Sequence, residues 1–337
     1  MSASPLPSES SEAQTSQVCL RLSILMPVYE DWDSAIALCG RIDDVFRDNQ
    51  SVTVRVLLID DGSVISRPPT ELKFKPSALR SASILGLRRN LGHQRAIAIG
   101  LAHLQQRDQG DAVVVMDADG EDRPEDIPKL IEAMKKSAYP TAVFAERGKR
   151  LENAGFRFFY QCFRILHNGL TGRDIRFGNF SIVPWSHLDS LVAFPELWNH
   201  YAATFVKSRL PYVRVRLDRA KRLSGQSRMN FVSLVIHGLS ALFANQEVVG
   251  TRVLVLNVII TLSLVFLASA VVAVKFLTRL AIPGWATTAL GLLLILVAQS
   301  LIASFLLVFS IMMNRNDLGF LPIRDYSHFV LFERALI

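Results

Sequence analysis

Apolar runs and amphipathic segments alternate along most of the chain, between about Leu20 and Phe243. Four apolar runs that end in polar residues have the composition of buried strands: residues 21–29, 54–63, 81–90 and 111–120. Residues 33–48 and 93–106 have apolar positions at helical spacing, and a capping Asp or Ser opens the first of these helices. This alternation predicts an α/β fold in which a mostly parallel, Rossmann-like sheet has helices on both faces.

The chain becomes much more apolar after this region. No charged residue occurs in residues 253–274 or 285–313, and each run can cross roughly 30 Å of hydrocarbon at about 1.5 Å per residue. Core helices of soluble proteins are usually shorter and keep a polar face, so two transmembrane helices joined by a short loop are predicted. Their strongly polar side chains, Asn257 and Gln299, are expected to form hydrogen bonds between the two helices.

The hydropathy pattern divides the chain into five parts. Residues 1–19 are rich in serine and proline, lack the apolar segment of a signal peptide, and are expected to form a disordered tail. The α/β domain at 20–228 is followed by an amphipathic region at 229–248 that can lie in the membrane interface. The two membrane helices fall within 249–314, and 315–337 form a C-terminal tail. Arginines at the outer ends of the two helices favour cytoplasmic termini.

Charge and composition narrow the classes of ligand. The net charge of +7 suits phosphate groups and anionic lipids, whereas the aromatic and basic residues do not interleave as nucleic-acid binding would require. No nucleic-acid partner is therefore expected. The three cysteines have no paired or metal-type spacing, which argues against a disulfide framework and a zinc site. His93, His167 and His200 form no ligand set and are interpreted as structural residues.

Polar residues gather where the predicted strands end. Parallel strands bring their carboxyl ends to one edge of a sheet, where ligands of such sheets bind. The sequence has neither of the two common glycine-rich phosphate loops, so a nucleotide diphosphate would have to bind in another way. Four carboxylates occur within residues 117–122 and repel one another, which requires a positive partner. Asp117 and Asp119 are spaced to hold one hard divalent cation, Mg²⁺ or Mn²⁺.

Six motifs occur in a set order and precede the two hydrophobic segments. They are ILMPVYED (24–31), VLLIDDGS (56–63), NLGHQRAIAIGL (90–101), VVVMDADGEDRPEDIPKL (113–130), FAERGKRLENAGFRFFYQCFRIL (144–166) and RLSGQSRMNF (222–231). In this order they resemble the family 2 glycosyltransferases of GT-A fold. Within that family the chain looks most like the polyprenyl-phosphate glycosyltransferases, which include dolichol-phosphate mannose synthase and bacterial undecaprenyl-phosphate sugar transferases.

The resemblance implies a role for each matching position. Asp117 and Asp119 would hold the metal and the donor diphosphate as catalytic residues. The implied nucleotide-sugar-binding residues are Pro27, Tyr29, Glu30 or Asp31, Asp60 or Asp61, Ala118 and Arg147. The later R-x-x-G-x-S-[KR] motif of the family matches Arg222, Gly225, Ser227 and Arg228. Its basic and hydroxyl groups would bind the acceptor phosphate, for which a guanidinium offers a bidentate fork.

Two departures from the family pattern affect this interpretation. A family stretch with Asp, a small hydroxyl residue, Gly, Phe and Arg aligns with residues 174–181, where Phe177 replaces the hydroxyl residue and Ser181 the Arg. A catalytic role for Asp174 therefore stays open. The sequence also lacks the Q-x-x-R-W motif of processive polysaccharide synthases, which favours transfer of a single sugar.

The expected activity is inverting transfer of one sugar from a nucleotide diphosphate sugar to undecaprenyl or dolichyl phosphate at the cytoplasmic membrane face. A phosphate monoester has a second pKa near 6, so this acceptor needs little help from a base. Transfer to a lipid, glycan or protein hydroxyl is the alternative and would need a base, with Asp174 or Glu196 as candidates. A non-catalytic membrane-anchored binding protein is a further alternative, and assembly into a homo-oligomer stays open.

Overall fold

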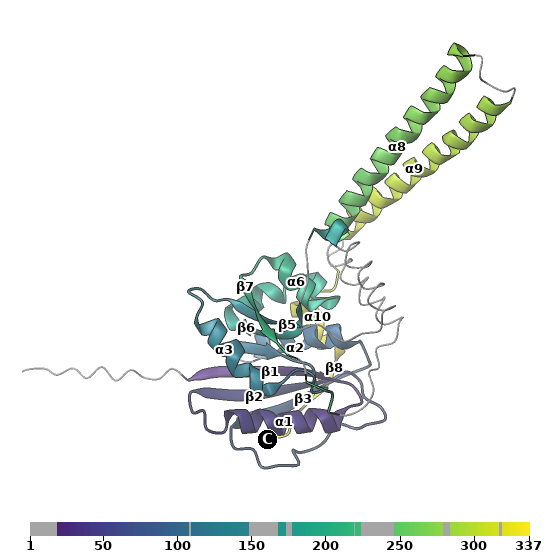
Figure 1. The fold of residues 1–337 in the computed structure, drawn as a ribbon. Coiled ribbons are helices and arrows are strands. Elements are labelled where there is room, and N and C mark those ends of the chain that lie inside the picture. The colour runs from purple at the N-terminus through teal and green to yellow at the C-terminus, as the bar shows by residue number, and fades with distance from the viewer. Residues whose placement is uncertain are drawn as a thin grey trace, which may run out of the picture.

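A computed structural model describes residues 19–107, 109–147, 168–172, 177–218, 220–223, 246–278, 284–316 and 319–337 (Figure 1). It contains an α/β domain and a long helical hairpin that projects from it. Most of the expected disordered tail and of the interfacial region at 229–248 lies outside the described residues, as do Asp174, Ser227 and Arg228.

The α/β domain is built on one mixed sheet. Its strands are β1 (Leu20–Val28), β2 (Val52–Asp60), β3 (Leu79–Leu87), β4 (Ala112–Val115), β5 (Ala142–Arg147), β6 (Phe177–Pro184), β7 (Tyr212–Leu217) and β8 (Val330–Ala335). In the described chain they have the order β7-β5-β6-β4-β1-β2-β3-β8. The central strands β4, β1, β2 and β3 are parallel to one another. Strand β6 is antiparallel to β4 and β5, and β8 is antiparallel to β3.

Helices cover both faces of this sheet and enclose two hydrophobic cores. Helix α1 (Trp32–Phe46) and α3 (Ile127–Lys135) contribute to the core on one face, and a 3₁₀ turn at Pro124–Asp126 packs beside them. Helices α2 (His93–Arg107), α5 (Leu188–Leu191) and α6 (Tyr201–Ser208) contribute to the core on the other face, beside 3₁₀ turns at Trp185–His187 and Pro195–Trp198. Central strands with apolar side chains on both faces require such double cover. The predicted α/β fold, with a mostly parallel sheet covered by helices on both faces, is confirmed.

The C-terminal residues differ from the expected tail. They form α10 (Pro322–Asp325), a 3₁₀ turn (Tyr326–Phe329) and strand β8, which pairs with β3 from Ser83 opposite Ala335 to Leu87 opposite Val330. Tyr326 is buried against α2 in the second core. Strand β8 thereby covers backbone groups of β3 that would otherwise form a sheet edge. Such pairing between distant segments leaves little mark on hydropathy, which is why a tail was expected.

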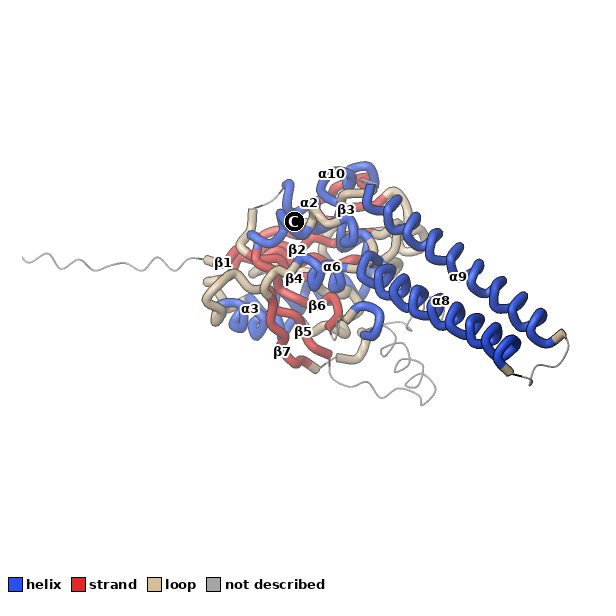
Figure 2. The backbone as a smooth tube through the Cα atoms, turned by 90° about the horizontal axis from the view of Figure 1, so that it is seen from above, coloured by secondary structure: helices blue, strands red, loops and turns tan. Residues whose placement is uncertain are grey.

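The hairpin consists of α8 (Gln246–Leu277) and α9 (Trp285–Asn316), which lie side by side in both views (Figures 1 and 2). Residues Glu247–Leu277 and Trp285–Met313 are long and apolar enough to cross a membrane, and most of their apolar side chains are exposed. Asn257 Nδ2 donates to the Ser300 carbonyl oxygen at 2.8 Å and to Ser304 Oγ at 2.7 Å. The predicted interhelical hydrogen bonds are thus confirmed for Asn257. The prediction is wrong for Gln299, because that side chain is exposed.

Candidate active site

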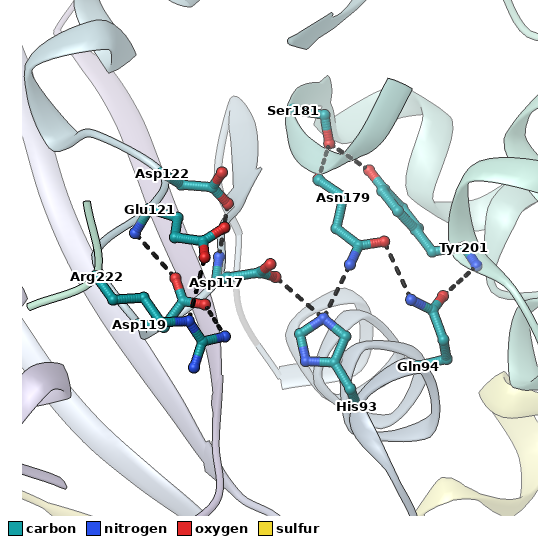
Figure 3. Close-up of polar contacts among 10 residues, drawn as sticks. All are labelled: His93, Gln94, Asp117, Asp119, Glu121, Asp122, Asn179, Ser181, Tyr201 and Arg222. Carbon is teal, nitrogen blue, oxygen red and sulfur yellow. Dashed lines mark hydrogen bonds and ion pairs between the residues drawn. The ribbon is translucent and has the colours of Figure 1, made fainter. Parts of the chain in front are cut away.

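The acidic residues after β4 form a tight turn at the carboxyl edge of the parallel strands. The backbone N–H of Asp117 donates to Asp122 Oδ2 at 3.0 Å, and that of Glu121 donates to Asp119 Oδ1 at 2.9 Å (Figure 3). Gly120 has φ = 84°, and a Cβ atom there would lie 2.5 Å from Leu223 Cγ. The turn therefore needs glycine both for its left-handed backbone and for the close approach of residue 223.

Arg222 supplies one of the positive partners that the carboxylates require. Its Nη2 lies 2.6 Å from Asp119 Oδ2, and its Nε lies 3.1 Å from Glu121 Oε1. Two backbone hydrogen bonds place it there, from the N–H of Leu223 to the Asp119 carbonyl oxygen and from the N–H of Ala220 to the Glu121 carbonyl oxygen, both 3.0 Å. The first residue of the predicted phosphate motif is therefore joined to the predicted metal-binding turn.

Electrostatic strain persists at Asp119 in spite of this ion pair. Burial raises the pKa of Asp119, and the neighbouring carboxylates of Asp117 and Glu121 raise it further. The Glu121 N–H and the Arg222 guanidinium lower it, but the pKa remains above its ordinary value of 3.8. The acidic turn therefore favours additional positive charge.

His93, the first residue of α2, approaches the turn from the other side (Figure 3). Its Nε2 lies 3.0 Å from Asp117 Oδ1 and 2.9 Å from Asn179 Nδ2. Burial lowers the pKa of His93, but the carboxylates of Asp117, Asp119 and Asp122 raise it, so that it lies above 6.5. The sequence alone indicates only a structural role for His93. Its place in the motif at the end of β3, at the ligand-binding edge, is the signal that could have found it.

A chain of amides orients the His93 ring. The backbone N–H of Tyr201 donates to Gln94 Oε1 at 2.7 Å, which turns Gln94 Nε2 toward Asn179 Oδ1 at 3.1 Å. The amide nitrogen of Asn179 consequently faces His93 Nε2. Because Nε2 offers either one proton or one lone pair, it can bond to Asp117 or to Asn179, but not to both. Neither Gln94 nor Asn179 was predicted as a site residue.

Carboxylates near the ends of β1 and β2 have backbone partners instead. Asp60 Oδ1 accepts from the Ser63 N–H at 3.0 Å. The two oxygens of Asp61 accept from the N–H groups of Leu91 at 2.7 Å and Gly92 at 2.9 Å. Burial raises the pKa of Asp61 to about 6, although both N–H groups oppose this shift. Asp61 therefore ties the loop after β2 to the loop after β3.

Glu30 behaves in the same way. Its Oε1 accepts from the N–H groups of Val64 at 2.6 Å and Ile65 at 3.0 Å, and its Oε2 accepts from that of Ser66 at 2.6 Å. The backbone of Glu30 has φ = 55°, which is uncommon for a residue other than glycine. These contacts make Glu30 a cap for the loop at residues 64–66, whereas the resemblance implied a direct contact with the donor.

The remaining predicted residues occupy several positions. Pro27 lies in β1 opposite Ile59 of β2, and Tyr29, just beyond β1, is partly exposed. Ala118 is buried in the acidic turn. Arg147 ends β5, on the far side of β6 from β4. Glu196, a candidate base for a hydroxyl acceptor, has its Oε1 2.6 Å from Lys207 Nζ. The structure thus brings together Asp117, Asp119 and Arg222 from the predicted set and adds Glu121, Asp122 and His93.

The donor atoms of the acidic turn suit a hard divalent cation, because carboxylate oxygens are the ligands that Mg²⁺ and Mn²⁺ prefer. Within the described part of the chain, however, no three His, Cys, Asp or Glu side chains already surround a common metal position. Instead, Arg222 Nη2 donates a hydrogen bond to Asp119 Oδ2. Cation binding through Asp119 Oδ2 would therefore require Arg222 to move.

Several known proteins have sequences similar to that of this chain. The chain is 24% identical over 276 residues to an uncharacterized glycosyltransferase of Synechocystis (81% of this chain and 85% of the relative). It is 27% identical over 225 residues to a prophage bactoprenol glucosyl transferase homolog of Escherichia coli (63% and 67%). It is 37% identical over 114 residues to the undecaprenyl-phosphate 4-deoxy-4-formamido-L-arabinose transferase of Aeromonas hydrophila (33% of each chain).

Among solved structures, the chain is similar to glucosyl-3-phosphoglycerate synthase of Mycobacterium tuberculosis in complex with Mn²⁺, uridine-diphosphate-glucose and phosphoglyceric acid. The identity is 16% and the TM-score 0.49, with 68% of this chain and 80% of that one covered. The family model that matches is Glycosyl transferase family 2, over residues 23–183. The chain therefore carries a glycosyl transferase family 2 domain and is a glycosyltransferase whose relatives include polyprenyl-phosphate sugar transferases.

Proposed function

We propose that this glycosyltransferase moves a single sugar, with inversion, from a nucleotide diphosphate sugar to undecaprenyl or dolichyl phosphate at the cytoplasmic face of a membrane. The names of the relatives support a polyprenyl-phosphate acceptor. The long apolar hairpin beside the domain supports an acceptor that resides in the membrane. The acidic turn, at the sheet edge where ligands of parallel sheets bind, supports a donor diphosphate bound through a cation.

The proposal depends chiefly on the ion pairs that Arg222 forms with Asp119 and Glu121 of the acidic turn. Both substrates bring phosphate groups to the reaction, and their negative charges must be brought close together for transfer. Arg222 lies 2.6 Å from Asp119, so the segment that begins the phosphate motif already lies beside the predicted donor site. A cation on Asp117 and Asp119 would displace the guanidinium and leave it available to a phosphate oxygen.

Within this mechanism the protein mainly positions charges. A cation held by Asp117 and Asp119 would act as a Lewis acid on the leaving diphosphate. Arg222 would hold the acceptor phosphate, which is largely anionic at neutral pH and can attack without a strong base. The engagement of Glu196 with Lys207 is in keeping with a reaction that does not need Glu196 as a base. Orientation and charge neutralisation would then supply most of the rate enhancement.

One incubation tests the reaction. Membranes that contain the full-length chain are mixed with a panel of labelled nucleotide sugars and polyprenyl phosphate, with Mg²⁺ or Mn²⁺ or with EDTA, and extracted into organic solvent. We expect label from one donor to enter the organic phase only when the cation is present. Label that appears in protein or in water-soluble glycans, with none in the lipid, would favour the alternative hydroxyl acceptor. Equal activity in EDTA would contradict the metal assignment.

The membrane orientation needs a separate experiment. We propose that the α/β domain and both ends of the hairpin are cytoplasmic, with only the loop near residue 281 on the far side. Single cysteines at position 281, at Ile65 and at Leu331 can be treated with a membrane-impermeant thiol reagent, since Ile65 and Leu331 are both well exposed. In intact cells we expect labelling at position 281 only. Labelling of Ile65→Cys in sealed cells would contradict the cytoplasmic site.

A further inference from the structure

The ion pair between Arg222 and Asp119 engages an oxygen atom that a cation would also need (Figure 3). Asp119 Oδ1 accepts from the Glu121 N–H, within the backbone of the turn, so Oδ2 is the oxygen that can change its partner without movement of the chain. Arg222 Nη2 lies 2.6 Å from Oδ2, and the two side chains are only 30% and 16% exposed. Arg222 and a cation therefore compete for the same atom, in a place where water screens charges less than at an open surface.

Arg222 can leave Asp119 without leaving the acidic turn. Its Nε, the guanidinium nitrogen nearest the backbone, lies 3.1 Å from Glu121 Oε1. The backbone hydrogen bonds of Ala220 and Leu223 to the turn hold this segment in place independently of the Arg222 side chain. Rotation about the Cδ–Nε bond moves Nη2 away from Asp119 while Nε stays beside Glu121. The outer nitrogens of the guanidinium are then available to a phosphate group, for which they offer a matching fork.

The charges of the turn make a cation and a phosphate depend on each other. The turn has four carboxylates within residues 117–122, and Arg222 neutralises the charge of one. The remaining carboxylates repel a phosphate that approaches Arg222, and a divalent cation on Asp117 and Asp119 would remove this repulsion. Conversely, Arg222 no longer competes for Asp119 once its guanidinium is bound to phosphate. Both effects have the same sign, so each ligand strengthens the binding of the other, and this coupling is reciprocal.

We propose that the contact between Arg222 and Asp119 is autoinhibitory and couples the two substrates. Arg222 blocks Asp119 while the acceptor is absent, and the acceptor phosphate opens the metal site by drawing the guanidinium away. The donor diphosphate is therefore held tightly only when an acceptor is bound. This limits hydrolysis of the donor, in which a water oxygen forms the new bond to the sugar, the nucleotide diphosphate leaves and a proton goes to solvent. The inference rests on the proposed function, from which it takes the cation and the phosphate acceptor.

Direct measurement of Mn²⁺ binding tests this coupling without any turnover. The full-length chain is placed in nanodiscs of zwitterionic lipid that contain either polyprenyl phosphate or, as the matched control, the neutral polyprenol. No nucleotide sugar is added, and the free Mn²⁺ is measured by electron paramagnetic resonance. Nanodiscs without protein correct for Mn²⁺ that the polyprenyl phosphate binds by itself. We expect the parent chain to bind Mn²⁺ roughly 5- to 150-fold more tightly with polyprenyl phosphate, the usual range for coupling between two sites.

Substitutions at position 222 isolate the competing group. Arg222→Ala, and the more conservative Arg222→Gln, should bind Mn²⁺ more tightly than the parent in polyprenol nanodiscs, because the competitor for Asp119 is gone. Polyprenyl phosphate should then add little further affinity. Lys221→Ala removes the same charge from an exposed neighbour and should behave like the parent.

Two results would overturn the coupling: equal Mn²⁺ affinity of the parent with both lipids, or the same gain from polyprenyl phosphate in the Arg222 variants as in the parent. Asp119→Asn separates this failure from a failure of the proposed function. The variant should bind Mn²⁺ more weakly than the parent with either lipid, because it lacks the carboxylate charge. An unchanged affinity would contradict the proposed metal site itself, on which the inference rests.

Discussion

Two acidic turns follow the strands on either side of β1, and they hold their carboxylates by different means. At the end of β2, Asp60 and Asp61 accept hydrogen bonds from backbone N–H groups. After β4, Asp117 and Asp119 contact the side chains of His93 and Arg222. A backbone N–H can leave only if its loop moves, whereas a guanidinium can swing away by rotation of its side chain. The first turn is therefore suited to shaping the site and the second to exchanging partners with ligands.

Burial disfavours the ionised carboxylates of both turns, but the neighbouring groups that respond to this charge differ. The pKa of Asp61 rises to about 6 mainly through burial, with its two N–H partners opposing the shift. The pKa of Asp119 is raised by burial and then by Asp117 and Glu121. For Asp61 the groups that oppose the shift include two backbone N–H groups of the protein itself. For Asp119 a cation would relieve the repulsion among the neighbouring carboxylates.

The largest expected effect comes from Asp119→Asn. The amide keeps the shape and can still accept from the Glu121 N–H, but it removes the charge that would bind the cation. Transfer should fall by roughly 100- to 1,000-fold, the scale on which one electrostatic group contributes to catalysis. The substitution removes the ion pair with Arg222 but also the repulsion from Asp117 and Glu121. The melting temperature of the full-length protein in detergent should therefore change little. Near-parental activity would show that this turn does not bind the metal.

Arg222→Ala should have the next largest effect. Loss of a charged hydrogen bond to phosphate should raise the apparent KM for polyprenyl phosphate roughly 10- to 100-fold, with a smaller change for the nucleotide sugar. Lys221→Ala is the matched control, since Lys221 is an exposed neighbour with the same charge. Steady-state kinetics with each substrate varied in turn measures both values. Equal effects on the two substrates would contradict the placement of Arg222 at the acceptor.

Asp61→Asn should act on stability. Its two oxygens bind two backbone N–H groups, and an amide offers a single acceptor oxygen, so one buried N–H loses its partner. We expect a loss of about 1–3 kcal/mol in the free energy of unfolding. Asp44→Asn is the control, because the ion pair of Asp44 with Arg47 is exposed and should contribute little. Denaturant unfolding of the full-length chain in detergent gives both values.

The pH dependence of the same variant sharpens this test. The folded pKa of Asp61, about 6, lies above its ordinary value of 3.8, so the folded state retains a proton that the unfolded state releases. The resulting stabilisation is fully present below pH 3.8 and is lost as pH rises to about 6. Asp61→Asn should lack this fall. A parallel pH profile for parent and variant would show that Asp61 does not titrate with a raised pKa.

Glu30→Gln should have the smallest effect. The variant keeps one acceptor oxygen, so the loop at residues 64–66 loses part of its cap. We expect faster hydrogen exchange at these residues and a donor KM raised roughly three- to tenfold, as for the loss of about one hydrogen bond. Asp33→Asn, at an exposed position, is the control. A raised donor KM without faster exchange would instead indicate that Glu30 contacts the nucleotide directly.

Much of this organisation could be predicted from local sequence. Runs of β-branched residues mark β2 and β4, and the acidic residues after them sit where parallel strands present ligand-binding groups. The apolar lengths of α8 and α9 mark the hairpin. The C-terminal strand β8 could not be found in this way, because its stability comes from pairing with β3, far away in the chain.

The amino-acid sequence by itself determined which groups carry the chemistry: the carboxylates at residues 117–122, the basic residue at 222 and two apolar spans. Only the tertiary structure decided their partners. Local sequence cannot show that Arg222 contacts a carboxylate about a hundred residues away, that His93 lies 3.0 Å from Asp117, or that Glu30 caps a loop. Nor can it show which face of α9 carries Gln299 outward. Side-chain chemistry is a property of each residue, whereas contacts between distant segments depend on how the sheet and helices pack.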